Sequence, residues 1–177
     1  DHRESRGLGD VYKRQGVVRA ALDSGAFDTF HFPDGMISAK LVENFGSEID
    51  GSTGQVPGTN SEGAGIFATM ATAAGFDGTS PFAGESYDAA ALIMLAMQAA
   101  GSSDPAVYKD HVMSVANAPG LTINPGQLGL ALQAVAAGIA INYDGATAVE
   151  LIGSGESAGN YKQVQYSDGA QVTVKYR

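Results

Sequence analysis

The segment that most constrains this chain is Glu85–Ala100, ESYDAAALIMLAMQAA, which reads as a single helix. Its central part, Ala89–Ala96, is apolar on almost every side and has no polar stripe. An amphipathic surface helix keeps one polar face toward water, so a helix without one is expected to be buried. The segment is also shorter than the roughly 20 residues of a membrane span. We therefore expect a core helix of a folded domain.

The residues before this helix alternate between predicted helices and predicted strands. In chain order they are a helix end at Val17–Ser24, a strand at Phe27–Phe32, a helix at Ser38–Phe45, an extended segment at Gly54–Val56 and a helix at Ser61–Ala74. Ser61 is expected to be the N-cap of the last of these helices. Alternation of this kind is typical of an α/β domain with a parallel sheet.

Two further helices and a run of short strands are predicted after the core helix. Asp104-Pro105 and Asn124-Pro125 each supply an N-cap followed by proline, for helices ending near Asn117 and covering Gly126–Ala137. The expected strands are Ile141–Tyr143, Ala148–Ile152, Tyr161–Tyr166 and Ala170–Tyr176. Asp168-Gly169 predicts a tight hairpin between the last two strands.

Residues 1–15, DHRESRGLGDVYKRQ, differ in composition from the rest of the chain. They have no apolar periodicity and no apolar run long enough for a signal peptide. Ser5–Gln15 resembles the in-frame translation of a transposase sequencing adaptor; the alternative is a genuine basic N-terminal arm. On the first interpretation residues 1–15 are non-native, the native sequence begins in mid-gene at Gly16, and any signal peptide has been lost.

Charge and composition exclude several classes of function. The chain has 10 Lys and Arg against 19 Asp and Glu; residues 1–15 hold four of these basic and three of these acidic residues, so residues 16–177 have 6 against 16. A chain this acidic lacks the basic face of a nucleic-acid-binding protein. It has no Cys, which excludes thiolate catalysis and Cys-ligated metals. His31 and His111 have no partner at ligand spacing, so we predict neither a metal site nor a cofactor.

Two residues are candidates for ligand binding. Asp34 follows a predicted strand, and ligands of open α/β sheets bind beyond the carboxyl ends of strands, where a carboxylate can hold an ammonium group. The alternative is an ordinary Pro-Asp-Gly turn in which Asp34 bonds to its own backbone. Phe82 precedes the core helix in a loop, where it could wall an apolar pocket or serve as a packing residue.

Four segments resemble, in order and spacing, periplasmic binding proteins of the type I fold. The resemblance is to the leucine/isoleucine/valine-binding group, which serves ABC importers of hydrophobic amino acids and amides. The segments are Phe30–Met36 (FHFPDGM), Gly54–Thr59 (GQVPGT), Ser86–Gly101 (SYDAAALIMLAMQAAG) and Ile141–Gly169. Each motif is weak alone, and together they span Gly16 to Arg177.

This resemblance implies an incomplete α/β fold, namely the C-terminal part of a two-lobed type I periplasmic-binding-protein fold. Its parallel sheets are flanked by helices and its lobes are joined by hinge crossovers. Beyond residues 1–15, it implies that residues 16–56 end lobe 2, that 57–140 supply closing helices of lobe 1, and that 141–177 are strands returning to the hinge and lobe 2.

The resemblance also implies a function without catalysis or a cofactor. The chain would belong to the substrate-binding component of an ABC importer, a periplasmic monomer that delivers a branched-chain-type amino acid or amide to an inner-membrane permease. Asp34 matches the position that holds the ligand's ammonium group, and Phe82 matches an aromatic residue against its apolar side chain. The alternatives are a sensor domain of the same fold, or an α/β enzyme fragment with Asp34 or Glu85 as general base.

Overall fold

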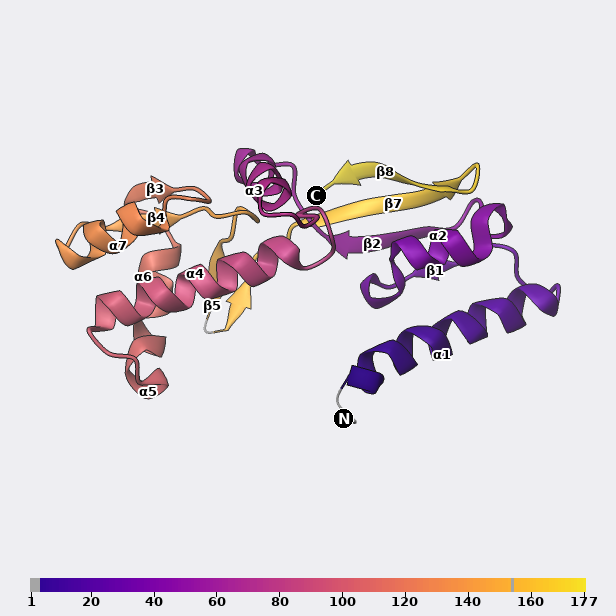
Figure 1. The fold of residues 1–177 in the computed structure, drawn as a ribbon, viewed down its shortest axis with the longest axis horizontal. Coiled ribbons are helices and arrows are strands. Elements are labelled where there is room, and N and C mark those ends of the chain that lie inside the picture. Colours follow the sequence, from indigo (N-terminus) through magenta and orange to yellow (C-terminus); the bar gives the residue numbers. More distant parts are fainter. Residues whose placement is uncertain (1–3, 154) are drawn as a thin grey trace. The chain divides into compact units, whose positions relative to one another are not determined.

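The computed structural model describes residues 4–153 and 155–177, with side chains from residue 14 onward (Figure 1). The chain forms two compact units. The first comprises the chain up to Pro57 together with Tyr161–Arg177, and the second comprises Gly58–Asn160. The boundaries expected from the sequence lay after residues 56 and 140. The structure places residues 141–160 in the second unit, because their strands and loop pack against its helices.

The first unit is one mixed sheet with helices packed against it. Its elements are α1 (Glu4–Asp23), β1 (His31–Phe32), the 3₁₀ turn η1 (Asp34–Met36), α2 (Ala39–Phe45), the 3₁₀ turn η2 (Gly46–Ile49), β2 (Thr53–Pro57), β7 (Tyr161–Ser167) and β8 (Ala170–Tyr176). The strand order is β1-β2-β7-β8, with β1 and β2 parallel and the other pairs antiparallel. Its buried core includes Phe32, Leu41, Ile49, Val164 and Tyr166.

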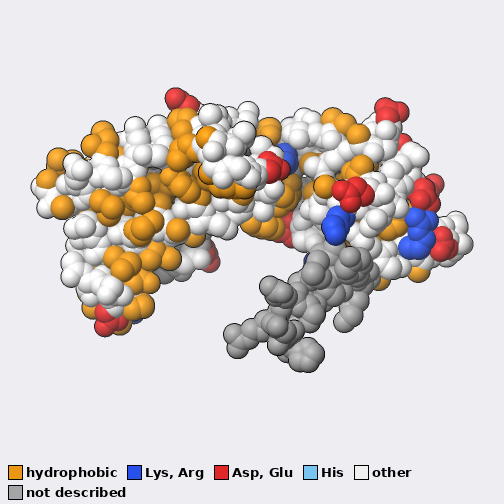
Figure 2. All heavy atoms as spheres, viewed as in Figure 1, with side chains coloured by type: hydrophobic (Ala, Val, Ile, Leu, Met, Phe, Trp, Pro, Cys, Tyr) orange, Lys and Arg blue, Asp and Glu red, His pale blue; other side chains and the backbone are white. Residues whose placement is uncertain are grey.

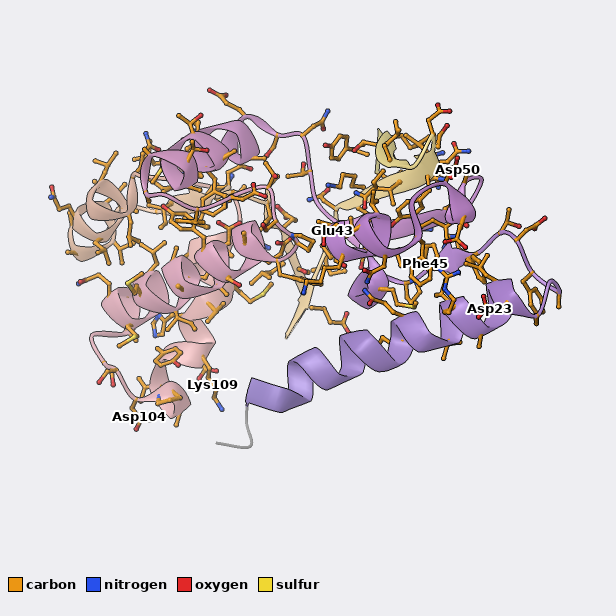
Figure 3. The ribbon with its side chains drawn as sticks, turned by 45° about the vertical axis from the view of Figure 1, so that its right-hand side comes forward. Asp23, Glu43, Phe45, Asp50, Asp104 and Lys109 are labelled. Carbon is orange, nitrogen blue, oxygen red and sulfur yellow. The ribbon has the colours of Figure 1, made fainter. Side chains whose placement is uncertain are left out.

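Helix α1 runs without a break across the change in composition at Gly16. A glycine inside a helix costs only about 1 kcal/mol relative to alanine, so it does not end one. Figure 3 labels Phe45 on α2. The guanidinium of Arg19, on α1, lies 5.0 Å from the centre of the Phe45 ring and forms two hydrogen bonds, of 2.7 and 2.8 Å, with Glu48. These contacts fix α1 to α2 and η2.

The strand predicted at Phe27–Phe32 is shorter in the structure. Only His31 and Phe32 pair with β2, and Phe27 is 64 % exposed. Bonding to β2 begins at Phe30, whose carbonyl accepts from the N–H of Thr53 at 2.9 Å. No bond to β2 is described for the residues before Phe30 in this segment. The predicted hairpin is confirmed, with positive φ at both Asp168 (53°) and Gly169 (70°), as a tight two-residue turn requires.

The second unit is mainly helical. Its elements are α3 (Glu62–Ala73), α4 (Ala83–Ala100), α5 (Pro105–Tyr108), the 3₁₀ turn η3 (Lys109–His111), α6 (Val112–Ala116), β3 (Leu121–Ile123), α7 (Leu128–Ala136), β4 (Ile141–Tyr143), β5 (Leu151–Gly153) and β6 (Glu156–Ser157). Strands β3 and β4 form a parallel pair, and β5 and β6 an antiparallel pair. No helix in the described part of the chain is long and apolar enough to cross a membrane.

Helix α4 is the core helix that the sequence predicts, but it is buried on one side only. Leu92, Leu95 and Ala96 are buried, and α5, α6 and α7 pack against the helix. Ile93 and Met94 are 44 % and 41 % exposed, which corrects the expectation of burial on all sides. The described elements cover one face of α4, and apolar side chains therefore reach the surface of this unit (Figure 2).

Two of the three predicted caps are confirmed. The hydroxyl of Ser61 accepts from the N–H of Ala64 at 3.2 Å, and the carboxylate of Asp104 accepts from Ala106 at 2.9 Å. The helix predicted from Asp104 onward nevertheless divides into α5, η3 and α6. Asn124 does not cap α7: its N–H donates to the side chain of Gln127 at 2.8 Å in a turn, and the helix begins afterwards.

Stability of the first unit should fall at alkaline pH. Burial raises the pKa of Tyr166 from its ordinary 10.0 to about 12. The folded state thus retains this proton where the unfolded chain loses it, so the contribution is complete below pH 10 and disappears as pH rises through 12. Urea unfolding at a series of pH values between 10 and 12 should show that the free energy of unfolding declines less steeply with pH in Tyr166→Phe than in the parent. Tyr161→Phe, which removes an exposed tyrosine of the same strand, should retain the steep decline. Equal declines in both variants would contradict this assignment.

Candidate functional site

Asp34 lies where the sequence places it, directly beyond the carboxyl end of β1. Pro33 ends the strand and Asp34 opens the 3₁₀ turn η1. The side chain is exposed, and its Oδ1 accepts from the N–H of Gly35 at 2.6 Å. Among the described residues this N–H is the only group that bonds to the carboxylate. The turn interpretation is thus correct for the local geometry, and it leaves an accessible anionic oxygen that can accept from a ligand.

Phe82 lies in the second unit, at the N-cap of α4, with an unusual backbone conformation. Its φ is 67° and its ψ is 3°, the left-handed region, which costs a non-glycine residue roughly 1–2 kcal/mol. Its carbonyl accepts from the N–H of Ser86 at 3.0 Å, which starts the helix. The ring is 44 % exposed. A strained residue that presents an aromatic ring to solvent is the kind of outlier that clusters at binding sites.

A group of aromatic side chains supports the start of α4 from within the second unit. The Phe67 ring on α3 lies 5.0 Å from the Tyr87 ring and 6.3 Å from the Phe76 ring. The Tyr87 hydroxyl accepts from the N–H of Gly126 at 2.9 Å. Ala83, the residue after Phe82, also packs against this aromatic group.

Asp88 is a buried side chain of the second unit with four hydrogen bonds, and sequence reasoning missed its role. It does not cap α4, because Phe82 is the N-cap. The carboxylate is 2 % exposed and accepts from the Tyr143 hydroxyl (3.0 Å), the N–H of Ala146 (2.8 Å), and both the N–H (2.8 Å) and the hydroxyl (2.7 Å) of Thr147. An acidic residue directly before the apolar stretch of the helix was the only signal of this network.

Burial around this network favours neutral forms of its neighbours. Burial, with the nearby charge of Asp88, raises the pKa of Tyr143, so its hydroxyl remains a donor. Burial, followed by the charges of Asp88 and Glu62, raises the pKa of Asp144. Stability from Asp144 is therefore largest at low pH and decreases as pH rises through its folded-state pKa.

The described residues offer little catalytic or metal chemistry. They contain no group of three His, Asp or Glu side chains that could hold a metal ion. His31 is exposed, and its Nδ1 lies 2.9 Å from the hydroxyl of Thr53. Asp34 has no titratable partner among the described side chains, whereas a general base needs a second positioned group.

A groove of about 800 Å³ in the described part of the chain does not include either candidate residue. It runs along α4 in the second unit and is lined by Ala89, Leu92, Ile93, Met113 and Leu151, with Lys109, Asp110 and Glu156 among the charged residues. Part of its lining is the exposed apolar face of α4. Phe82, at the N-cap of α4, is not among its lining residues.

Comparison with known proteins gives one structural match. No family model matches the chain, and no curated protein matches it. A crystal structure of a leucine-binding protein, LivK from Thermotoga maritima, aligns with a TM-score of 0.63 at 16 % identity. The alignment covers 90 % of this chain and 40 % of that one, so the chain spans less than half the length of this neighbour. The chain therefore has part of a type I periplasmic-binding-protein fold, an α/β architecture with parallel strands flanked by helices.

Backbone strain at Phe82 can be measured. Phe82→Gly should be more stable than Phe82→Ala by about 1 kcal/mol, because only glycine adopts positive φ without cost. Both variants lose the ring, so their difference isolates the backbone. Urea unfolding followed by circular dichroism measures it. Equal stabilities, or a more stable alanine variant, would show that the left-handed conformation is not strained.

Proposed function

We propose that this chain belongs to a substrate-binding protein that captures a hydrophobic, branched-chain-type amino acid or a related amide between two closing lobes. The observation that carries the proposal is the position of Asp34. Its exposed carboxylate stands at the carboxyl end of a parallel strand, in a fold similar to that of a leucine-binding protein. Ligands of α/β sheets bind at this position.

Each candidate residue supplies one part of amino-acid recognition. Asp34 would accept hydrogen bonds from the ligand's ammonium group, and a charge-assisted bond of this kind is about twice as strong as a neutral one. Phe82 would pack its exposed ring against the ligand's apolar side chain. Asp34 belongs to the first unit and Phe82 to the second.

We assign the first unit to the end of lobe 2 and the second unit to the closing helices of lobe 1, with residues 1–15 outside the native sequence. Two features of the second unit support its assignment to a larger lobe. Ile93 and Met94 expose an apolar face on a central helix. Strands β3 and β4 form a parallel sheet of only two strands, whereas parallel sheets are normally covered on both faces. A longer protein would supply the remaining strands.

The biological setting follows from the same resemblance. We propose a periplasmic, non-enzymatic receptor that acts as a monomer and delivers its ligand to an ABC permease of the inner membrane. Binding needs no cofactor in this proposal. The fold's similarity to that of a leucine-binding protein supports a receptor over an enzyme.

The ammonium contact gives the first functional prediction. In the longer protein that contains this chain, Asp34→Asn should weaken leucine binding by about 2–4 kcal/mol, the scale of breaking one partner of a charged contact. Calorimetric titration measures the change. Glu43→Gln is the matched control, because Glu43 is an exposed carboxylate of the same unit on α2. Unchanged affinity in Asp34→Asn would remove Asp34 from the site.

A further inference from the structure

The carboxylate of Asp88, on α4, forms hydrogen bonds with the loop that follows β4. Its four hydrogen bonds come from Tyr143, Ala146 and Thr147, which lie 55 to 59 residues further along the chain. A Cβ at Gly145 would collide with this carboxylate, so the backbone of the loop approaches as closely as the chain allows. The loop after β4 is thereby held against the second turn of the helix.

The same loop also contacts the first turn of α4. A Cβ added to Gly84 would lie 3.2 Å from the Thr147 methyl group and 3.5 Å from the Cβ of Ala146. Gly84 is two residues from Phe82, and Ala83 between them packs on the cluster that contains Ala146. The loop therefore contacts the helix next to Phe82, and Asp88 is the group that fixes the loop.

Other roles for Asp88 do not fit the geometry. The four donors occupy both oxygens, so no acceptor is left for a ligand or metal. A base needs access to its substrate, and this side chain is 2 % exposed. The network instead has the features of a positioning device, since every bond joins the start of α4 to one loop.

We propose that Asp88 is a positioning residue of the ligand-binding site, which holds the Tyr143–Thr147 loop against α4 and so keeps Phe82 in its left-handed conformation. Only the statement that Phe82 contacts ligand rests on the proposed function. A strained backbone conformation persists only where the surrounding structure offsets its cost. In this proposal the bonds to Asp88 offset the strain at Phe82. Asn160 extends the arrangement: its side chain donates to the Thr147 carbonyl at 3.0 Å.

The chain contains no tryptophan, which makes a direct test possible. Phe82→Trp places a single reporter at the site, and acrylamide quenching of its fluorescence measures how exposed and mobile it is. In this background, Asp88→Asn and Thr147→Val should raise the quenching constant by about twofold, because a side chain that is 44 % exposed has about that much surface left to expose. Thr147→Ser keeps the hydroxyl donor and should behave as the parent.

A control separates positioning from loss of stability. Leu95→Val removes a methylene group from the buried core of the same unit, two turns beyond Asp88 on α4, so it should destabilise the unit without raising the quenching constant. Unchanged quenching in folded Asp88→Asn and Thr147→Val would overturn the proposal, as would a rise in Leu95→Val equal to the rise in those two variants. If Asp88→Asn does not fold, the Thr147→Val and Thr147→Ser pair decides. No ligand is present, so failure of leucine to bind the longer protein would leave this result standing.

Discussion

A buried carboxylate organises the second unit. Removing an ionised Asp88 from water is costly unless its oxygens are fully bonded. Here two backbone N–H groups and two hydroxyls bond to it, without a cation among its partners. Such an arrangement is stable only when all donors are in place together, so it fixes the loop after β4, the start of α4 and the path of the chain between them.

The two proposed ligand contacts have the opposite character. Asp34 and Phe82 are exposed, lie on short loops at the ends of regular elements, and have few partners of their own. A side chain that binds a ligand needs hydrogen-bonding atoms that are not already used within the protein. A buried structural side chain needs all of its hydrogen bonds formed within the protein. The contrast between Asp34, with one bond, and Asp88, with four, distinguishes a carboxylate available to a ligand from one committed to the fold.

Sequence reasoning succeeded where the determining chemistry is local. The cap at Ser61 and the turn at Asp168-Gly169 depend on neighbouring residues, and both were predictable. The type I fold also followed from the order of the motifs. The role of Asp88 was not predictable, because its partners lie more than fifty residues away and no local pattern pairs them. The exposure of Ile93 was missed because burial depends on which elements are present, not on the helix alone.

The most direct test compares two ligands on the longer protein that contains this chain. Leucine and isocaproate share an apolar chain and a carboxylate, but only leucine has an ammonium group. If the Asp34 carboxylate holds that ammonium, calorimetry should show leucine binding tighter than isocaproate by on the order of a hundredfold, and Asp34→Asn should remove most of that preference. Equal affinities for the two ligands, or a preference that survives Asp34→Asn, would contradict the proposed site.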